Sequence, residues 1–187
     1  MRTFIAVEFS DDIRQRLAAA QERLRGSVSG VKWVEPGILH LTLKFLGEID
    51  EGAVDGVAGA MADAAAGVSP FEVRVAGLGA FPPHGAPRVV WAGLADPSGS
   101  LQALHDTLDR GLEPLGIEPE GRPFTAHLTI GRVKEPRGAQ ALRALIEKQA
   151  PAEFGVQRVE ELVLFRSVLS SSGPTYTPLR RHPFQRT

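Results

Sequence analysis

One short pattern occurs twice in this chain, and it limits both the fold and the chemistry more than any other feature of the sequence. Leu39-His40-Leu41-Thr42-Leu43 is repeated as Ala126-His127-Leu128-Thr129-Ile130, with the second histidine 87 positions after the first. Apolar and polar residues alternate in both copies, which is the period of a half-buried β-strand. Because this separation is close to half of the 187-residue chain, we expect two related lobes that each offer one strand to a shared cleft.

The rest of the chain shows an irregular alternation of strand and helix patterns. This order, with hairpin-like strand pairs, favours an antiparallel α+β fold over a doubly wound parallel sheet. A segment rich in Gly and Pro over residues 79–87 predicts a loop. We expect strands near residues 3–9, 38–45, 71–78, 88–94, 124–133, 159–169 and 175–179, and helices near residues 11–26, 51–66, 98–115 and 137–149.

Each His-x-Thr places an imidazole beside a hydroxyl, because residues two apart on a strand point to the same side. An unperturbed imidazole has a pKa of about 6.5, so at neutral pH one ring can accept a proton while the other donates one. Two threonine hydroxyls can donate hydrogen bonds to the two non-bridging oxygens of a phosphodiester. The doubled pattern therefore predicts acid/base cleavage of a phosphodiester, but it does not decide which histidine is the acid.

Metal binding is the main competing interpretation of the histidines. Neither His40 nor His127 has a second ligand at the usual zinc spacing, and the chain contains no Cys, so we expect no metal site. A lone histidine on a strand is most often a structural group, but the doubling argues against that reading here. The other histidines, His84, His105 and His182, have no partnered threonine, and we expect them at the solvated surface.

Charge is distributed unevenly along the chain. Residues 1–120 hold 10 Lys and Arg against 17 Asp and Glu, whereas residues 121–187 hold 11 against 5. A basic C-terminal third suits an anionic ligand such as a phosphate group, although it could equally balance the acidic part of the same molecule. The sequence shows neither a signal peptide nor an apolar run of membrane-spanning length, so we expect a cytoplasmic protein with no membrane partner.

A wider set of residues extends this picture to nearly the whole chain. In their order and spacing, these residues resemble the RNA 2′,3′-cyclic phosphodiesterases, also called bacterial 2′-5′ RNA ligases, of the two-histidine phosphoesterase superfamily. The resemblance implies one domain over residues 1–187, with two pseudo-symmetric lobes, an antiparallel sheet and flanking helices in each, and an active cleft between them. The residues are Arg2-Thr3-Phe4-Ile5-Ala6-Val7, His40 to Gly47, Gly79-Ala80-Phe81-Pro82, Pro87-Arg88-Val89-Val90-Trp91, Pro123 to Arg132, and Tyr176-Thr177-Pro178-Leu179.

The resemblance also implies an activity and a role for each motif residue. Members of the family open a terminal 2′,3′-cyclic phosphate on RNA, typically to a 2′-phosphate end, without a metal or another cofactor. By this resemblance His40 is the proton donor to the leaving 3′ oxygen, and His127 is the proton acceptor that activates water. Thr42 and Thr129 hold the phosphate oxygens.

Three further residues are candidates for substrate binding. Arg132 matches an arginine that the family places near the phosphate, but strict alternation puts it opposite His127, so a turn or bulge at Gly131 must bring it to the cleft. Lys44 shares the face of His40 by alternation, and Phe81 could stack on a base. Each also has a plain structural interpretation: a surface Arg at a strand end, a solvated Lys, and an aromatic plug of the core.

Three functions remain open from the sequence. The first is hydrolysis of the cyclic phosphate, and the second is 2′-5′ RNA ligation, in which a 5′-hydroxyl replaces water at the same site. The third is a module that binds RNA ends without turnover, which the basic C-terminal part of the chain would suit. All three imply RNA ends or nucleotides with a 2′,3′-cyclic phosphate as partners, and we expect a monomer.

Overall fold

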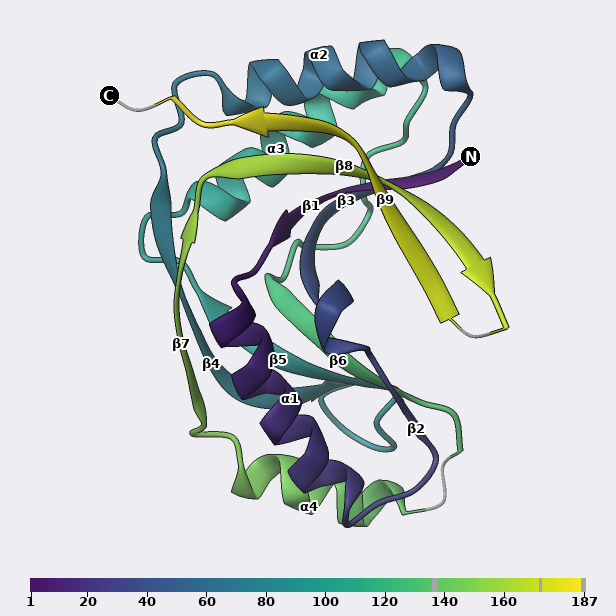
Figure 1. The fold of residues 1–187 in the computed structure, drawn as a ribbon, viewed down its shortest axis with the longest axis vertical. Coiled ribbons are helices and arrows are strands. Elements are labelled where there is room, and N and C mark those ends of the chain that lie inside the picture. The colour runs from purple at the N-terminus through teal and green to yellow at the C-terminus, as the bar shows by residue number, and fades with distance from the viewer. Residues whose placement is uncertain (136–137, 172, 186–187) are drawn as a thin grey trace.

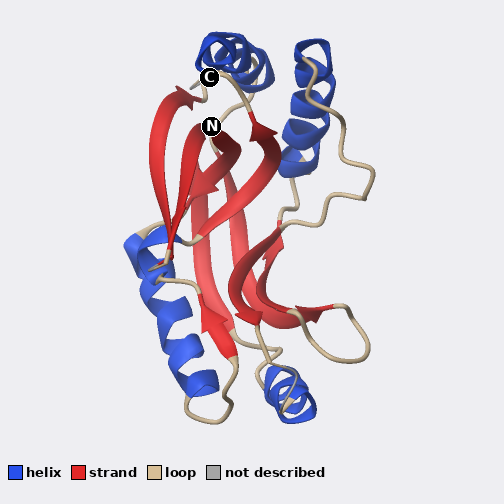
Figure 2. Ribbon diagram, turned by 90° about the vertical axis from the view of Figure 1, so that its right-hand side faces the viewer, coloured by secondary structure: helices blue, strands red, loops and turns tan. Residues whose placement is uncertain are grey.

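The computed structural model describes residues 1–135, 138–171 and 173–185. Within these ranges, nine strands form two antiparallel sheets and four α-helices lie on the outer sides of the strands (Figures 1 and 2). The predicted α+β class with an antiparallel sheet in each of two lobes is therefore confirmed. We call the part built on the four-stranded sheet the first lobe and the part built on the five-stranded sheet the second lobe.

The first lobe carries one of the two His-x-Thr strands at the edge of its sheet. Two helices, α2 (Val54–Ala65) and α3 (Ser100–Leu112), cover the sheet, with α3 against β3 and α2 against β8 and β9. Along β1, Ile5 and Val7 face this helical side, whereas Phe4 and Ala6 form a small separate apolar cluster on the opposite side. The strands run in the order β3 (His40–Glu48), β1 (Arg2–Glu8), β8 (Glu161–Ser170) and β9 (Gly173–Pro183).

The second lobe carries the other His-x-Thr strand. Helices α1 (Asp11–Arg25) and α4 (Ala139–Lys148) pack against this sheet and each other. Helix α1 begins where the sequence predicts, because Ser10 caps it and accepts a hydrogen bond from the backbone N–H of Ile13, with Asp11 and Asp12 in the first turn. The strands run in the order β2 (Val31–Trp33), β6 (His127–Val133), β5 (Val89–Ala95), β4 (Phe71–Phe81) and β7 (Glu153–Val159).

The two lobes do not correspond to two consecutive halves of the chain. After β1 in the first lobe, the chain passes to α1 and β2 in the second and returns with β3 to the first, and it crosses again several times before β9. One hydrophobic cluster runs through both lobes, since it includes Leu41 of β3 as well as Leu128 of β6. The repeat in the sequence is therefore a repeat of strands and not of two consecutive halves of the chain.

Several predicted boundaries are wrong at the edges of the second sheet. Strand β4 continues to Phe81 through the predicted loop, because Gly79, Ala80 and Phe81 pair with β5. Strands β2 and β7 were not predicted: β2 has only three residues, and β7 exposes Val156 on its solvent side. The predicted helix over residues 137–149 is observed from Ala139, and residue 137 lies outside the described residues.

Candidate active site

The two motif histidines are held in the same way. His40 Nδ1 lies 2.7 Å from the carbonyl oxygen of Ile38, and His127 Nδ1 lies 2.7 Å from the carbonyl oxygen of Thr125. A carbonyl oxygen can only accept, so in both rings Nδ1 carries the proton and donates it. In both rings this leaves Nε2 as the nitrogen that can take up or release a proton during a reaction.

The strands that carry these histidines meet where the two sheets come together. Strand β3 belongs to one sheet and β6 to the other, and the two strands are in contact. The chain just before β3 is also tied to β6, because Val34 N donates to Ile130 O at 3.0 Å. The buried side-chain amide of Gln21 in α1 donates to Val34 O at 2.7 Å and to Ile130 O at 2.9 Å. The tertiary structure thus brings the two His-x-Thr strands into one region.

The threonines lie on the histidine side of their strands, as predicted. Thr42 and Thr129 are half-buried like the two histidines, while Leu41 and Leu128 between them are buried in the core. Thr42 Oγ1 lies 3.1 Å from His40 Nε2, and with the proton on Nδ1 the hydroxyl donates to this nitrogen. Thr129 follows His127 by two residues on β6, so its hydroxyl shares the side of that ring, and a threonine on the histidine side of both strands suits a phosphate held between the rings.

A β-bulge in each motif strand changes the alternation after the threonine. In β6, Gly131 pairs with Val90 and Thr129 with Trp91, so Ile130 is the extra residue. This bulge returns the exposed Arg132 to the side of His127, as expected from the sequence, although the extra residue is Ile130 and not Gly131. Burial lowers the pKa of His40 and raises the pKa of Tyr176, and the charge of Arg132 is close enough to add to the first shift and to oppose the second.

The matching bulge in β3 overturns the prediction for Lys44. Ile5 pairs with Lys44 and Ala6 with Thr42, so Leu43 is the extra residue and Lys44 moves to the side opposite His40. The side chain of Lys44 is 1% exposed, and its ammonium donates to Glu118 O at 2.7 Å and lies 2.5 Å from Asp109 Oδ1. Lys44 is therefore a buried ion-pair partner of α3 and does not reach the substrate.

Aromatic rings surround both histidines. Phe4 stacks on His40 at a centroid distance of 4.8 Å, and Tyr176, the only tyrosine of the chain, meets the same ring edge-on at 5.1 Å. Phe81 meets His127 edge-on at 5.1 Å and packs on Trp91 at 5.5 Å. The structure thus brings the candidate Phe81 to the site, at the end of β4 and not in a loop.

Several residues that the fold brings close to the motifs were not predicted from the sequence. Phe4 and Tyr176 belong to the stretches that carry the family resemblance, and alternation along β1 is the signal that could have placed Phe4. Exposed Lys32 pairs in register with Arg132 from β2, a strand too short to be predicted. Glu8, Arg14 and Arg132 surround His40 closely enough to influence its charge.

The pKa of His40 is lowered below its ordinary value of 6.5. Burial is the main cause, because a protonated ring loses hydration there. The hydrogen bond to Ile38 opposes this effect, the charges of Arg14 and Arg132 lower the pKa further, and the charge of Glu8 raises it. His40 is consequently neutral at pH 7 in the substrate-free protein.

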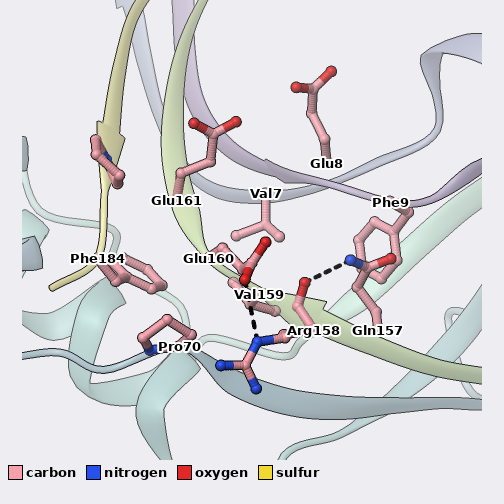
Figure 3. A pocket seen from close by; sticks show the side chains of 11 residues that line it. Val7, Glu8, Phe9, Pro70, Gln157, Arg158, Val159, Glu160, Glu161 and Phe184 are labelled. Carbon is pink, nitrogen blue, oxygen red and sulfur yellow. Dashed lines mark hydrogen bonds and ion pairs between the residues drawn. The ribbon is translucent and has the colours of Figure 1, made fainter. Parts of the chain in front are cut away.

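A pocket of about 130 Å³ opens beside His40 on the side of the four-stranded sheet that carries Phe4. Its lining includes Tyr176, Glu8 and Arg14. A wider pocket of about 500 Å³ lies where β1, β7 and β9 meet, and Figure 3 shows Glu8 and Phe184 among its lining residues. Neither motif histidine lines this wider pocket, whereas His40 lines the smaller one.

One of the three remaining histidines does not lie where the sequence predicts. His105 was predicted at the surface, but it is 4% exposed, donates from Nδ1 to Leu43 O at 2.8 Å and stacks on Phe124. It is therefore a structural group that holds α3 on β3, whereas His84 is exposed and His182 half-buried. Among the described residues, no group of three or more His, Cys, Asp or Glu side chains could hold a metal ion.

Comparison with known proteins gives consistent matches over almost the entire chain. The family described as the 2′-5′ RNA ligase superfamily matches residues 9–167, a range that includes both motifs. The RNA 2′,3′-cyclic phosphodiesterase of Methanothermobacter thermautotrophicus is 38% identical over 179 residues, which is 96% of either chain. The protein of the same name from Archaeoglobus fulgidus is 38% identical over 180 residues, 96% of this chain and 98% of its own.

Solved structures are similar over the same range. The crystal structure of TT0787 from Thermus thermophilus has a TM-score of 0.84 and 34% identity, and covers 100% of this chain and 99% of its own. The crystal structure of E. coli LigT complexed with 3′-AMP has a TM-score of 0.80 at 24% identity. It covers 99% of this chain and 98% of its own, and it shows the shared fold.

Among the described residues, no helix has the length and apolar character needed to cross a membrane.

Proposed function

This chain belongs to the 2′-5′ RNA ligase superfamily, and we propose that it is an RNA 2′,3′-cyclic phosphodiesterase in which His40 and His127 are the acid and base. Curated relatives that cover nearly the whole chain carry this activity as their name. The observation that carries the mechanism is the meeting of β3 and β6, each with a histidine whose Nδ1 is fixed and whose Nε2 is available.

The reaction needs two proton transfers and charge stabilisation at one phosphorus atom. His127 accepts a proton from water, the water oxygen forms a bond to phosphorus, and the bond from phosphorus to O3′ breaks. His40 gives its Nε2 proton to O3′, so the product is a 2′-phosphomonoester with a free 3′-hydroxyl. The acid/base pair supplies both transfers, and we therefore propose that no metal takes part.

The neutral state of free His40 fits this role once the substrate is bound. An anionic phosphate next to the ring favours the protonated imidazole, which opposes the effect of burial on its pKa. Protonation of Nε2 ends the hydrogen bond that Thr42 donates to it, so the hydroxyl becomes free to donate to a phosphate oxygen. Thr129 takes the equivalent position in the second lobe, and Arg132 adds positive charge.

Substitution of each histidine tests the proposal. His40→Ala and His127→Ala should each lower kcat for opening of a 2′,3′-cyclic phosphate on a short RNA by about 10²- to 10⁴-fold. His84→Ala is the matched control, because His84 is exposed and outside the site. Full activity in either motif variant would refute the acid/base assignment, and loss of activity with a chelator would refute the metal-free mechanism.

Ligation is the second candidate function, and the description of the family favours it. A 5′-hydroxyl of another RNA can replace water as the nucleophile, with the same proton transfers. Incubation of one RNA with a 2′,3′-cyclic end and another with a 5′-hydroxyl should then yield a 2′-5′ junction. Product NMR distinguishes this junction from a 2′-phosphate or a 3′-phosphate, and tight RNA binding without any product would instead identify a binding module.

We further propose that residues 1–187 work as one bilobal domain and that the protein is a cytoplasmic monomer. The large hydrophobic cluster that spans both lobes supports the proposal of one domain. Light scattering of the purified protein tests whether it is a monomer.

A further inference from the structure

Helix α1 buries one polar side chain, Gln21, in the middle of its apolar stripe. Gln21 is 2% exposed, and its neighbours on the buried face include Leu17 and Leu24. A buried amide is costly unless it is hydrogen-bonded, so its partners indicate its role. Its Nε2 donates to Val34 O at 2.7 Å and to Ile130 O at 2.9 Å, 13 and 109 residues away. Both protons of this nitrogen are therefore used, each on a different segment of the chain.

One of the two acceptors belongs to the bulge in β6. Ile130 is the extra residue of this bulge, so it has no pairing partner in β5. Its carbonyl oxygen instead accepts from Val34 N at 3.0 Å and from the amide of Gln21, which occupies both of its lone pairs. The bulge that returns Arg132 to the motif side of β6 is thus held in place from α1.

The other acceptor lies on the chain that leads to His40. Val34 is followed by a short 3₁₀ turn, Pro36–Ile38, which packs against α1. The carbonyl oxygen of Ile38 is the acceptor for His40 Nδ1. The amide of Gln21 therefore joins the segment that fixes His40 to the strand that carries the second motif, and Figure 1 shows α1 lying across this part of the second lobe.

From these contacts we propose that Gln21 is a positioning residue of the active site, which holds the two motif strands at a fixed separation and keeps Arg132 turned toward the phosphate. The proposal rests on the proposed function, because it takes His40 and His127 as the acid and base. An apolar side chain of the same size would fill the same space in the core, so packing alone does not explain an amide at this position. The arrangement requires two donors aimed at two carbonyl oxygens, which an uncharged primary amide supplies.

Removal of the two donors tests the proposal. Gln21→Met keeps the size of the side chain, and we expect kcat for a 2′,3′-cyclic phosphate to fall about 10- to 100-fold, because a displacement of about 1 Å at the reacting groups costs up to this much. KM should change less, since Thr42 and Thr129 remain. Gln21→Glu keeps the shape, and its protonated carboxyl can donate to one of the two oxygens, so its kcat should lie between the other two. This variant also replaces Gln21→Met if the latter does not fold.

A second substitution in the same helix controls for lost stability. Leu17, one turn before Gln21, is fully buried. Leu17→Ala leaves a cavity and should lower the urea midpoint of unfolding, but it removes no hydrogen bond from Val34 or Ile130. Its kcat should stay at the wild-type value under conditions in which circular dichroism shows both variants folded. An equal loss of kcat in Leu17→Ala and Gln21→Met would mean that Gln21 acts through stability alone, and would overturn the proposal.

A double mutant tests the connection with Arg132. If Gln21 acts through the bulge, Gln21→Met should lower kcat by a smaller factor in the Arg132→Met protein than in the wild type, because the guanidinium that it positions is already absent. Losses that multiply independently would contradict the placement of Arg132 by Gln21.

NMR titration of His40 gives a readout that does not depend on turnover. The charge of Arg132 lowers the pKa of His40, so this pKa should rise in Gln21→Met as the guanidinium moves away, and it should be unchanged in Leu17→Ala. Both variants keep the other charged groups that act on this pKa, Glu8 and Arg14.

The two measurements separate this proposal from the proposed function. A wild-type protein that opens no cyclic phosphate would refute the proposed function, and the titration would still decide whether Gln21 holds Arg132 near His40. An unchanged kcat together with an unchanged pKa of His40 in Gln21→Met overturns the proposal.

Discussion

At the scale of single residues, the site depends on how two identical side chains are surrounded. Both histidines donate from Nδ1 to the carbonyl two positions earlier, so the local chain fixes their tautomer. Their wider surroundings differ: His40 lies against Phe4 and Tyr176 with Glu8 and Arg14 nearby, whereas His127 meets Phe81. This difference, and not the motif, gives the two histidines a physical basis for unequal protonation.

The charges next to His40 should move its pKa in opposite directions. Arg14→Gln removes a positive charge that disfavours the imidazolium, so the pKa of His40 should rise. Glu8→Gln removes a negative charge that favours it, so the pKa should fall. NMR titration of the His40 ring Cε1–H signal measures this pKa in both variants. As a control, Arg25→Gln at the other end of α1 should leave the pKa of His40 unchanged. Shifts in the same direction for Arg14→Gln and Glu8→Gln would contradict this electrostatic description.

At the scale of the elements, the bulges decide which side chains reach the substrate. Without a bulge, alternation would leave Lys44 beside His40 and put Arg132 on the far side of its strand. The extra residue directly after the threonine in each strand reverses both placements: Lys44 enters the core against Asp109, and Arg132 turns to the side of His127. The bulges therefore explain why Arg132 lies on the expected side of its strand and why Lys44 does not.

Neutral substitution of these two cations should separate their roles. Arg132→Met should lower kcat/KM for the cyclic phosphate by roughly 10²- to 10³-fold, the typical effect of removing one group that stabilises developing charge. Lys44→Met should leave kcat/KM near the wild-type value, because its ammonium lies in the core and is not near the phosphate. Steady-state kinetics on a cyclic phosphate measures both. A similar loss of activity in the two variants, with both proteins folded by circular dichroism, would contradict the assignment.

At the scale of the whole molecule, the lobes share one core and one chain that crosses between them. The first lobe needs segments from both ends of the chain, since β1 lies next to β8, and the second lobe includes α1 from near the N-terminus. In the proposed mechanism a histidine from each lobe is needed, so the chemistry would depend on the packing of the two sheets together. Loss of either lobe would remove one member of the proposed acid/base pair.

The shared core should make unfolding a single transition. Both tryptophans, Trp33 and Trp91, belong to the five-stranded sheet, so their fluorescence reports on the second lobe. Far-UV circular dichroism reports on the helices and strands of both lobes. If residues 1–187 are one cooperative domain, the two signals should give the same urea midpoint. A fluorescence midpoint clearly separate from the dichroism midpoint would show that the lobes unfold independently.

The sequence by itself determined the class of chemistry and the face of each motif strand. The period of two in His40-Leu41-Thr42 and in its repeat is a local property, and it puts imidazole and hydroxyl on one side wherever the strand is packed. The α+β class and most helix positions follow from equally local periodicity. These features needed no knowledge of contacts between distant residues.

Only the tertiary structure decided which side chains accompany the motifs. The bulges at Leu43 and Ile130 depend on pairing with β1 and β5, so the burial of Lys44 and the return of Arg132 could not be derived from alternation alone. The pairing of Lys32 with Arg132, the burial of His105 and the place of Tyr176 likewise depend on partners far away in sequence. The physical reason is that register and packing between strands are set by nonlocal contacts, and a shift of one residue moves every later side chain to the other face.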